Sequence, residues 1–220
     1  MLVIVTGMRR EARIFGRDAN VVVCGGDNST LAAKLETALA RGGRAVISAG
    51  ICGGLSPALA VGTPVIGSGT VRQKTRWSAD AAWQDALAAK VPHAVRGTIA
   101  GSDVILTDPA HKAFLYGETG AIAVDMESHI CARIAAARGV PFAVLRVVSD
   151  AAANELPPAV SRALDAKGKV RMGAVLWSVA AQPRQVPELL QTARNTRRAL
   201  AELLRCFDLL GRDFACPYLG

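Results

Sequence analysis

The chain has 220 residues, of which 51% are hydrophobic and 5% aromatic, and its 26 Lys and Arg against 18 Asp and Glu give a formal net charge of +8. A chain of this length buries enough surface to fold without disulfide staples, so we expect a single domain over residues 1–220. Its apolar runs are much shorter than the about 20 residues that cross a bilayer, so we expect no membrane-spanning helix.

The charge, the aromatic content and the cysteines argue against a nucleic-acid partner and against a metal site. The positive charge is spread as single Arg residues and the aromatic side chains that stack on single-stranded nucleic acid are scarce, so we expect no nucleic-acid partner. Five scattered cysteines without a CxxC pair are typical of buried thiols, and no group of His, Cys and acids has metal-ligand spacing, so we expect no metal. The first residues lack the order of a secretory signal, which predicts a cytoplasmic protein.

Strand and helix patterns alternate along the chain. The predicted strands cover residues 2–5, 20–23, 44–48, 64–67, 98–100, 121–124 and 142–148. The predicted helices cover residues 9–15, 29–41 and 126–138, and Gly139 ends the third one. The glycine-rich stretch at residues 24–29 is predicted to be a turn, and residues 50–54 are either a tight turn or a backbone that approaches a ligand closely. This alternation is typical of a layered α/β domain with a largely buried sheet.

The last part of the chain has a different pattern. Apolar residues recur there at helical spacing among arginines, which predicts a C-terminal helical extension over residues 183–210 and a tail from Gly211. Three roles stay open for this helix: packing across the sheet, forming a subunit interface, or resting on anionic lipid at the inner membrane as a peripheral contact.

Three acidic side chains follow predicted strands. Glu11 comes shortly after strand 2–5, Glu127 after strand 121–124, and Asp150 after strand 142–148. Ligands of open α/β sheets bind outside the carboxyl ends of strands, so these acids indicate a common site if they converge. Each also has a structural explanation, because Glu11 and Glu127 suit the first turn of a helix and Asp150 suits an N-cap.

Together these motifs resemble the nucleoside phosphorylase and nucleosidase superfamily, which includes methylthioadenosine/adenosylhomocysteine nucleosidases and purine nucleoside phosphorylases. The resemblance covers residues 2–180 and is carried by Gly7-Met8 with Glu11 and by residues 49–55, 61–65, 124–128 and 146–150. Within the superfamily, the compact middle region and the Arg-rich C-terminal helix most resemble the hopanoid-associated phosphorylases. The resemblance implies a three-layer α/β/α fold with a central mixed sheet and a long C-terminal helix.

The resemblance also implies an activity: cleavage of the N-glycosidic bond of an adenine nucleoside, with adenosyl hopane giving adenine and a ribosyl or phosphoribosyl hopane. Asp150 would protonate the departing base at N7, Glu127 would accept hydrogen bonds from the ribose hydroxyls above Met126, and Glu11 would deprotonate an attacking water. Arg146 would hold that water or a phosphate. The remaining substrate-binding residues that it implies are Ser149, Ile51, Cys52, Gly53, Ile105 and Leu106.

Three positions depart from the family pattern. Ile51 replaces a Ser that is common near the nucleophile, and Ser48 replaces an Arg that binds phosphate in certain phosphorylases. Ile105 replaces an aromatic side chain that stacks on adenine in the nucleosidases. The segment 70–96 is shorter than the nucleosidase loop that encloses the 5′ substituent, which favours a pocket open to a lipid tail.

These features leave alternatives. Retention of Glu11 favours water as the nucleophile, because phosphate needs no general base, whereas the hopanoid-associated subgroup favours phosphate as a co-substrate. Two functions are alternatives to the cleavage of adenosyl hopane. The protein is then either a nucleosidase of small methylthioadenosine-type substrates, or a nucleoside or lipid binder of the same fold without turnover. We expect no cofactor, and the family implies a homo-oligomer. Of the three histidines, His129 lies nearest the acids, and we expect it on a helix surface.

Overall fold

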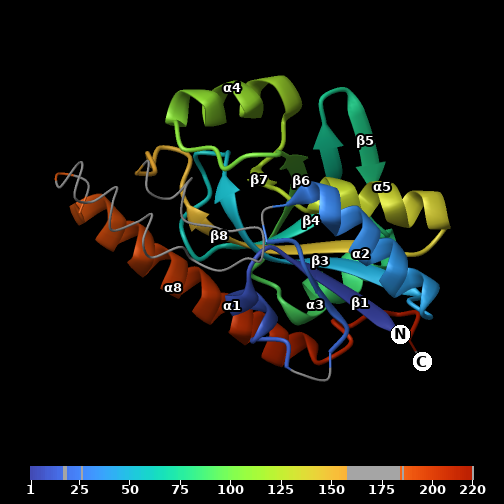
Figure 1. The fold of residues 1–220 in the computed structure, drawn as a ribbon. Helices are drawn as coiled ribbons and strands as arrows, with labels where there is room; N and C mark the ends of the chain where they lie inside the picture. Colours follow the sequence, from blue (N-terminus) through green and yellow to red (C-terminus); the bar gives the residue numbers. More distant parts are fainter. Residues whose placement is uncertain (17–18, 26, 158–183, 185, 220) are drawn as a thin grey trace.

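A computed structural model of the chain describes residues 1–16, 19–25, 27–157, 184 and 186–219. These residues form a sheet with helices on both sides (Figure 1). The strands are β1 (Leu2–Thr6), β2 (Val21–Val23), β3 (Ala45–Gly54), β4 (Pro64–Arg72), β5 (Thr75–Ser78), β6 (Val95–Gly101), β7 (Ala123–Asp125) and β8 (Phe142–Asp150). The helices are α1 (Arg9–Ala12), α2 (Asn28–Ala40), α3 (Ala81–Lys90), α4 (Pro109–Thr119), α5 (Ser128–Arg138) and α8 (Val186–Leu210).

The sheet is mixed, and part of it closes on itself. Strand β1 lies between β2 and β3 and is parallel to both. Strand β3 is also parallel to β8, while its last residues pair antiparallel with β7. Since β8 pairs with β4, β4 with β6, and β6 with β7, the strands β3, β8, β4, β6 and β7 form a ring. The mixed sheet that the resemblance implied is therefore confirmed.

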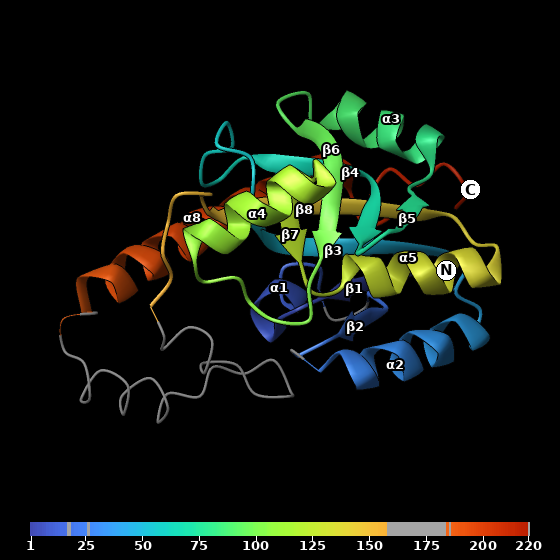
Figure 2. The same cartoon turned by 90° about the horizontal axis from the view of Figure 1, so that it is seen from above.

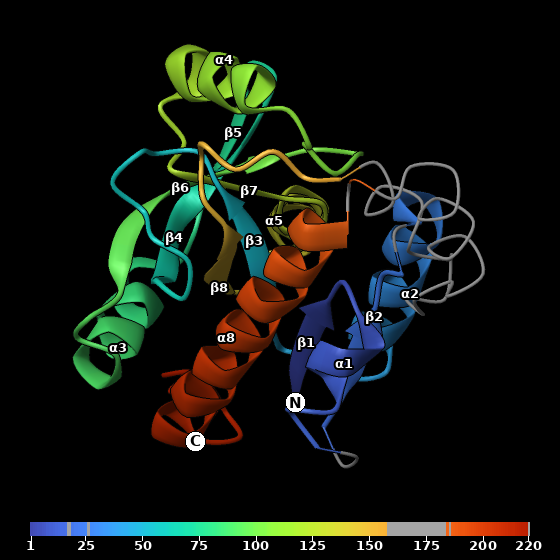
Figure 3. The same cartoon turned by 90° about the vertical axis from the view of Figure 1, so that its left-hand side faces the viewer.

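Helices cover the two faces of the sheet, which confirms the predicted three-layer arrangement. Helices α2 and α5 lie side by side on one face, where their Leu, Ile and Ala side chains pack on the strands (Figure 2). Helices α3 and α8 pack on the other face (Figure 3). Aliphatic side chains dominate both interfaces, so this core needs few aromatic residues.

Helix α8 has the amphipathic pattern that the sequence predicted. Its buried residues Ala199, Leu203, Cys206 and Leu210 pack on β8 and β3, so of the three roles considered, packing across the sheet is confirmed. The predicted extension began at residue 183, but residues 183 and 185 lie outside the described part of the chain. The following tail is anchored as well, because the Trp83 Nε1 donates a hydrogen bond to the Phe214 carbonyl at 2.8 Å. Among the described residues, no helix combines the length and the apolar character needed to cross a membrane.

The structure corrects several predicted elements. Of the two explanations for the glycine-rich residues 50–54, the tight turn is wrong, because they continue β3, which runs from Ala45 to Gly54. The first helix is only Arg9–Ala12 rather than residues 9–15. The prediction also missed β5, α3 and α4, although Asp80 and Asp108 cap the two helices by accepting hydrogen bonds from backbone N–H groups.

Candidate active site

Glu11 lies where the carboxyl ends of β1 and β3 meet. Its side chain is 1% exposed and accepts three hydrogen bonds. Oε2 accepts from the Thr6 hydroxyl at 2.5 Å and from the Met8 N–H at 2.7 Å, and Oε1 accepts from the Ile51 N–H at 2.7 Å. An ionised carboxylate has about four acceptor sites, so Glu11 keeps one for a ligand or a water.

Arg146 of β8 forms ion pairs with Asp125 at the end of β7 and with Glu127 just after it. Its Nη2 lies 3.1 Å from Glu127 Oε2, and its Nε forms an ion pair with Asp125 Oδ2 at 2.6 Å, without hydrogen-bond geometry. Nη2 also donates to the Ser48 hydroxyl at 2.6 Å, and Nη1 donates to the Ile51 carbonyl at 3.3 Å. Burial lowers the pKa of the guanidinium, but the surrounding carboxylates outweigh burial and raise the pKa, so Arg146 is charged.

Glu127 has the most perturbed carboxyl group of the cluster. Burial raises its pKa to about 7; the Arg146 guanidinium lowers the pKa in part, while Asp125 and Glu11 raise it. Three carboxylates therefore share one buried cation, and with a pKa of about 7 Glu127 is present in both its protonated and its ionised form near neutral pH. Carboxyl groups with a pKa near 7 are frequent in sites that move protons or stabilise charge.

Two glycines allow these side chains to approach the backbone. A methyl carbon added to Gly50 would lie 2.5 Å from Glu11 Oε1 and 2.7 Å from Arg146 Nη1. One added to Gly7 would lie 2.8 Å from Glu127 Oε1 and 3.6 Å from Glu11 Oε2. Glycine 50 is therefore not part of a turn; it is a strand residue that makes room for the acids and the arginine beside it.

Asp150 is the last residue of β8 and lies beside Gly53, farther along β3. The register of β3 and β8 shifts there, because Cys52 pairs with Val148 and Gly53 with Asp150, which leaves Ser149 without a partner residue. The Ser149 hydroxyl has one proton to donate and lies within hydrogen-bond distance of two acceptors, Asp150 Oδ1 at 3.0 Å and the Cys52 carbonyl at 3.1 Å. Asp150 thus ends a strand and is not the N-cap that the sequence left open.

The buried side chain of Lys112 completes this end of the site. Helix α4 covers the carboxyl ends of the neighbouring strands and carries Lys112, whose Nζ donates to Asp150 Oδ2 at 2.6 Å (Figure 1). Lys112 is not among the predicted site residues, because nothing in its local pattern distinguishes it from a solvent-exposed lysine. Asp125 is not among them either, and it holds the start of α5 by accepting the Ser128 N–H at 2.9 Å.

The remaining predicted residues have different positions. Met126 is half-buried between Asp125 and Glu127. Burial raises the pKa of the Cys52 thiol well above its usual value, so this thiol is protonated. Ile105 and Leu106 are half-buried in the segment before α4, where Leu106 packs on the apolar cluster beneath that helix. The structure thus brings Glu11, Glu127 and Arg146 together, places Asp150 and Ser149 nearby, and leaves Ile105 at the edge.

Two other features lie outside this cluster. His129 is buried, at 6% exposure, so its predicted place on a helix surface is wrong; Gly101 leaves room for its ring. Among the described residues, His93, Glu202 and Cys206 have ligand atoms within 4.8 Å of one another, but they lie at α8 and the loop after α3. His93 and Glu202 already form a hydrogen bond of 2.8 Å there.

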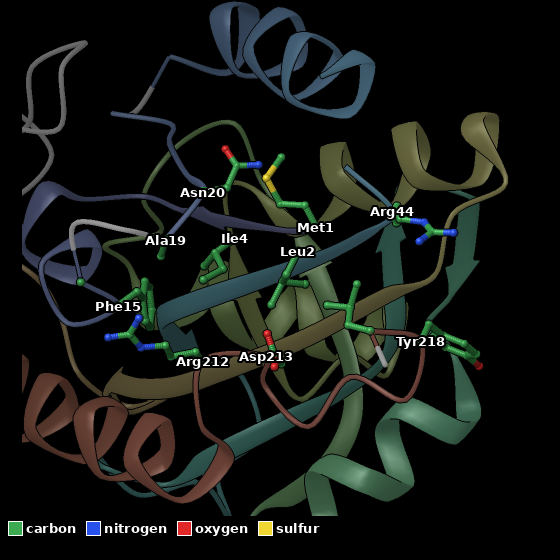
Figure 4. Close-up of a pocket in the computed structure, with 12 residues that line it drawn as sticks. Met1, Leu2, Ile4, Phe15, Ala19, Asn20, Arg44, Arg212, Asp213 and Tyr218 are labelled. Carbon is green, nitrogen blue, oxygen red and sulfur yellow. The ribbon is translucent and has the colours of Figure 1, made fainter. Parts of the chain in front are cut away.

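A pocket of about 450 Å³ lies at the opposite ends of the strands (Figure 4). Its lining includes Leu2 and Ile4 of β1, Arg44 just before β3, and Arg212 and Tyr218 of the C-terminal tail. None of the acids described above lines it. Ligands of α/β sheets bind at the carboxyl ends of strands, so this pocket is not the candidate active site.

Comparisons with known proteins agree with the fold and the motifs. The 5′-methylthioadenosine/S-adenosylhomocysteine nucleosidase of Treponema pallidum is 36% identical over 66 residues, which are 30% of this chain and only 24% of that protein. The enzyme of the same name from Geobacillus kaustophilus is 30% identical over 164 residues, which are 63% of this chain and 70% of that protein.

A solved structure and a family model extend the similarity over most of the chain. The Helicobacter pylori 5′-methylthioadenosine/S-adenosylhomocysteine nucleosidase, solved with butyl-thio-DADMe-Immucillin-A, superposes with a TM-score of 0.62 at 19% identity. The superposition covers 94% of this chain and 97% of that one, which shows a shared fold. The family model described as the phosphorylase superfamily matches residues 4–181. The chain therefore belongs to the phosphorylase superfamily.

Proposed function

We propose that the protein cleaves the N-glycosidic bond of an adenine nucleoside through an oxocarbenium-like transition state. The observation that carries the proposal is the buried cluster of Glu11, Glu127 and Arg146, with Asp150 beside Gly53, farther along β3. Gly50 and Gly53, which face the two parts of the site, are three residues apart, or about 10 Å along the strand. This separation suits a ligand that is held at its sugar and at its base.

Each acid has a role in this proposal. Asp150 interacts with N7 of the departing purine, because expelling an anionic base is costly unless a proton reaches it. Glu127 accepts hydrogen bonds from the ribose hydroxyls, and its negative charge stabilises the positive charge that develops on the sugar. Met126 lies beneath the sugar, next to Glu127.

Water is the proposed nucleophile. Glu11 keeps an acceptor site for a water, as a general base requires. A phosphate needs cationic or N–H donors, and each of the three guanidinium nitrogens of Arg146 already contacts a protein group. The Ser48 hydroxyl is buried against Arg146 and Ser128. Arg146 therefore supports Glu127 rather than holding a phosphate.

The 5′ substituent is proposed to be a lipid tail, as in adenosyl hopane. This proposal rests on the resemblance to the hopanoid-associated phosphorylases and on the segment 70–96. That segment forms a hairpin and α3, and α3 packs against α8 at the end of the molecule away from α4 (Figure 3). The second candidate is hydrolysis of 5′-methylthioadenosine-type substrates, which the names of the two sequence relatives favour.

Adenine release by the purified protein tests these proposals. We expect release from an adenosine with a long 5′-alkyl chain at a higher kcat/KM than from 5′-methylthioadenosine, and the reverse order would favour the second candidate. We expect equal rates with and without phosphate, so a strict phosphate requirement would refute the hydrolytic mechanism. Tight nucleoside binding without adenine release from any substrate would instead identify a binding protein.

Contact with the membrane and self-association remain proposals. The outer side of α8 exposes Leu190, Leu204 and Leu209 among arginines, which is compatible with a peripheral contact with anionic lipid. Sedimentation with anionic vesicles at low and high salt tests the contact, and absence of binding at low salt would refute it. Analytical ultracentrifugation tests the homo-oligomer that the family implies, and a monomer at micromolar concentration would contradict it.

A further inference from the structure

Lys112 is an unusual lysine because its whole side chain is buried. It is 0% exposed on α4, and its Nζ donates to Asp150 Oδ2 at 2.6 Å, to the Asn154 carbonyl at 3.0 Å and to the Ala151 carbonyl at 3.2 Å. These three contacts use the three N–H groups of an ammonium. A buried ammonium is costly unless it is paired and fully hydrogen-bonded. An apolar side chain at this position would avoid that cost, so the lysine indicates a role for its contact with Asp150.

This contact determines what Asp150 can do. Its Oδ2 accepts a hydrogen bond from Lys112, and its Oδ1 lies 3.0 Å from the Ser149 hydroxyl. A carboxylate that accepts from an ammonium carries no proton of its own to donate. The leaving purine nevertheless needs one, so a neighbour of Asp150 has to supply it. Of the two donors in contact, the ammonium is a far stronger acid than the serine hydroxyl.

We propose that Lys112 is a positioning residue that holds the Asp150 carboxylate and supplies, through it, the proton that the leaving purine takes up. This inference rests on the proposed N-glycosidic cleavage. The pairing also explains why a lysine, which releases a proton far more readily than an arginine, occupies the position.

One proton passes from Lys112 through Asp150 to N7 of the purine as the glycosidic bond breaks. The C1′–N9 bond breaks and its electron pair moves into the purine ring, which makes N7 basic. One N–H bond of the Lys112 ammonium breaks as an O–H bond forms on Asp150, and that O–H bond breaks as the N7–H bond forms. Neutral adenine leaves, Lys112 is a neutral amine, and the proton lost by the attacking water restores its charge through solvent.

The substitutions Lys112→Met and Lys112→Arg test this inference. Met removes the proton and the charge, whereas Arg keeps the charge and the donors but holds its protons at any pH that proteins tolerate. We expect kcat for adenine release to fall about 100-fold or more in both variants, within the usual range for general acid catalysis. We expect the dissociation constant for the nucleoside to change by less than about 3-fold. Exposed Lys90 provides the control, and Lys90→Met keeps the wild-type kcat.

A second substrate separates proton supply from a structural role. In 4-nitrophenyl riboside the leaving group is a weak base that departs without a proton, so Lys112→Met should cleave it at a rate close to wild type. Equal losses on both substrates, or a wild-type kcat for Lys112→Arg with the nucleoside, would overturn the inference about Lys112 while leaving the proposed function intact. Failure of the wild-type protein to release adenine from any nucleoside would instead refute the proposed function, and the inference with it.

Discussion

The proton on Glu127 makes the stability of the protein depend on pH. The pKa of this carboxyl rises from the ordinary 4.5 to about 7, chiefly through burial. The folded protein therefore binds this proton more tightly than the unfolded chain does, so the stabilisation is complete below about pH 4.5 and is lost as the pH rises to about 7. At about 1.4 kcal/mol for each pH unit, the whole change is about 3 kcal/mol in the free energy of unfolding.

Urea unfolding of wild type and Glu127→Gln at several values between about pH 5 and pH 8 measures this effect. The glutamine cannot ionise, so wild type should lose about 2 to 3 kcal/mol relative to the variant over this range. The control is Glu118→Gln, at an exposed glutamate of α4, which should follow the wild-type curve. If the stabilities of wild type and Glu127→Gln ran parallel with pH, the assignment of the raised pKa would be refuted.

The remaining predictions concern packing around the site and the core. Gly50→Ala forces a methyl carbon against Glu11 and Arg146, so adenine release should fall about 100-fold or more. The control Gly117→Ala, whose methyl carbon meets no atom within 4 Å, should keep the wild-type rate. Equal rates for the two variants would contradict the close approach at Gly50. Arg146→Met leaves buried carboxylates unpaired and should cost about 3 to 5 kcal/mol in urea unfolding at neutral pH; a loss below about 1 kcal/mol would contradict the central ion pairs. Trp83→Ala should cost about 3 to 5 kcal/mol in the same assay, because it removes a fully buried ring and its bond to the tail, and an unchanged midpoint would contradict that anchoring.

The sequence predicted the layers and many of the strands, because period and composition identify buried strands and amphipathic helices well. It also selected Glu11, Glu127 and Asp150, since acids that follow strands are local features of the chain. It missed α3 and α4, because Ala residues and a few large side chains give these helices little amphipathic pattern, although Asp80 and Asp108 were available as caps.

The other errors depend on contacts between distant residues. A glycine-rich stretch is typical of a turn, and only the register of β8 against β3 shows that Gly50 is in a strand opposite Arg146. Likewise, Lys112 is 38 residues from Asp150 in the sequence, so no local spacing connects them. His129 is buried because Gly101 of β6 leaves space for its ring, which a helical pattern alone does not show.

The most direct test of the account is adenine release by wild type and by Asp150→Asn, measured on the same adenine nucleoside. Asparagine keeps the size of the side chain but accepts no proton from Lys112, so kcat should fall about 100-fold or more while nucleoside binding persists. The matched control is Asp85→Asn, at an aspartate that is 71% exposed on α3, and it should release adenine at the wild-type rate. An Asp150→Asn variant as fast as wild type would contradict the proposed site.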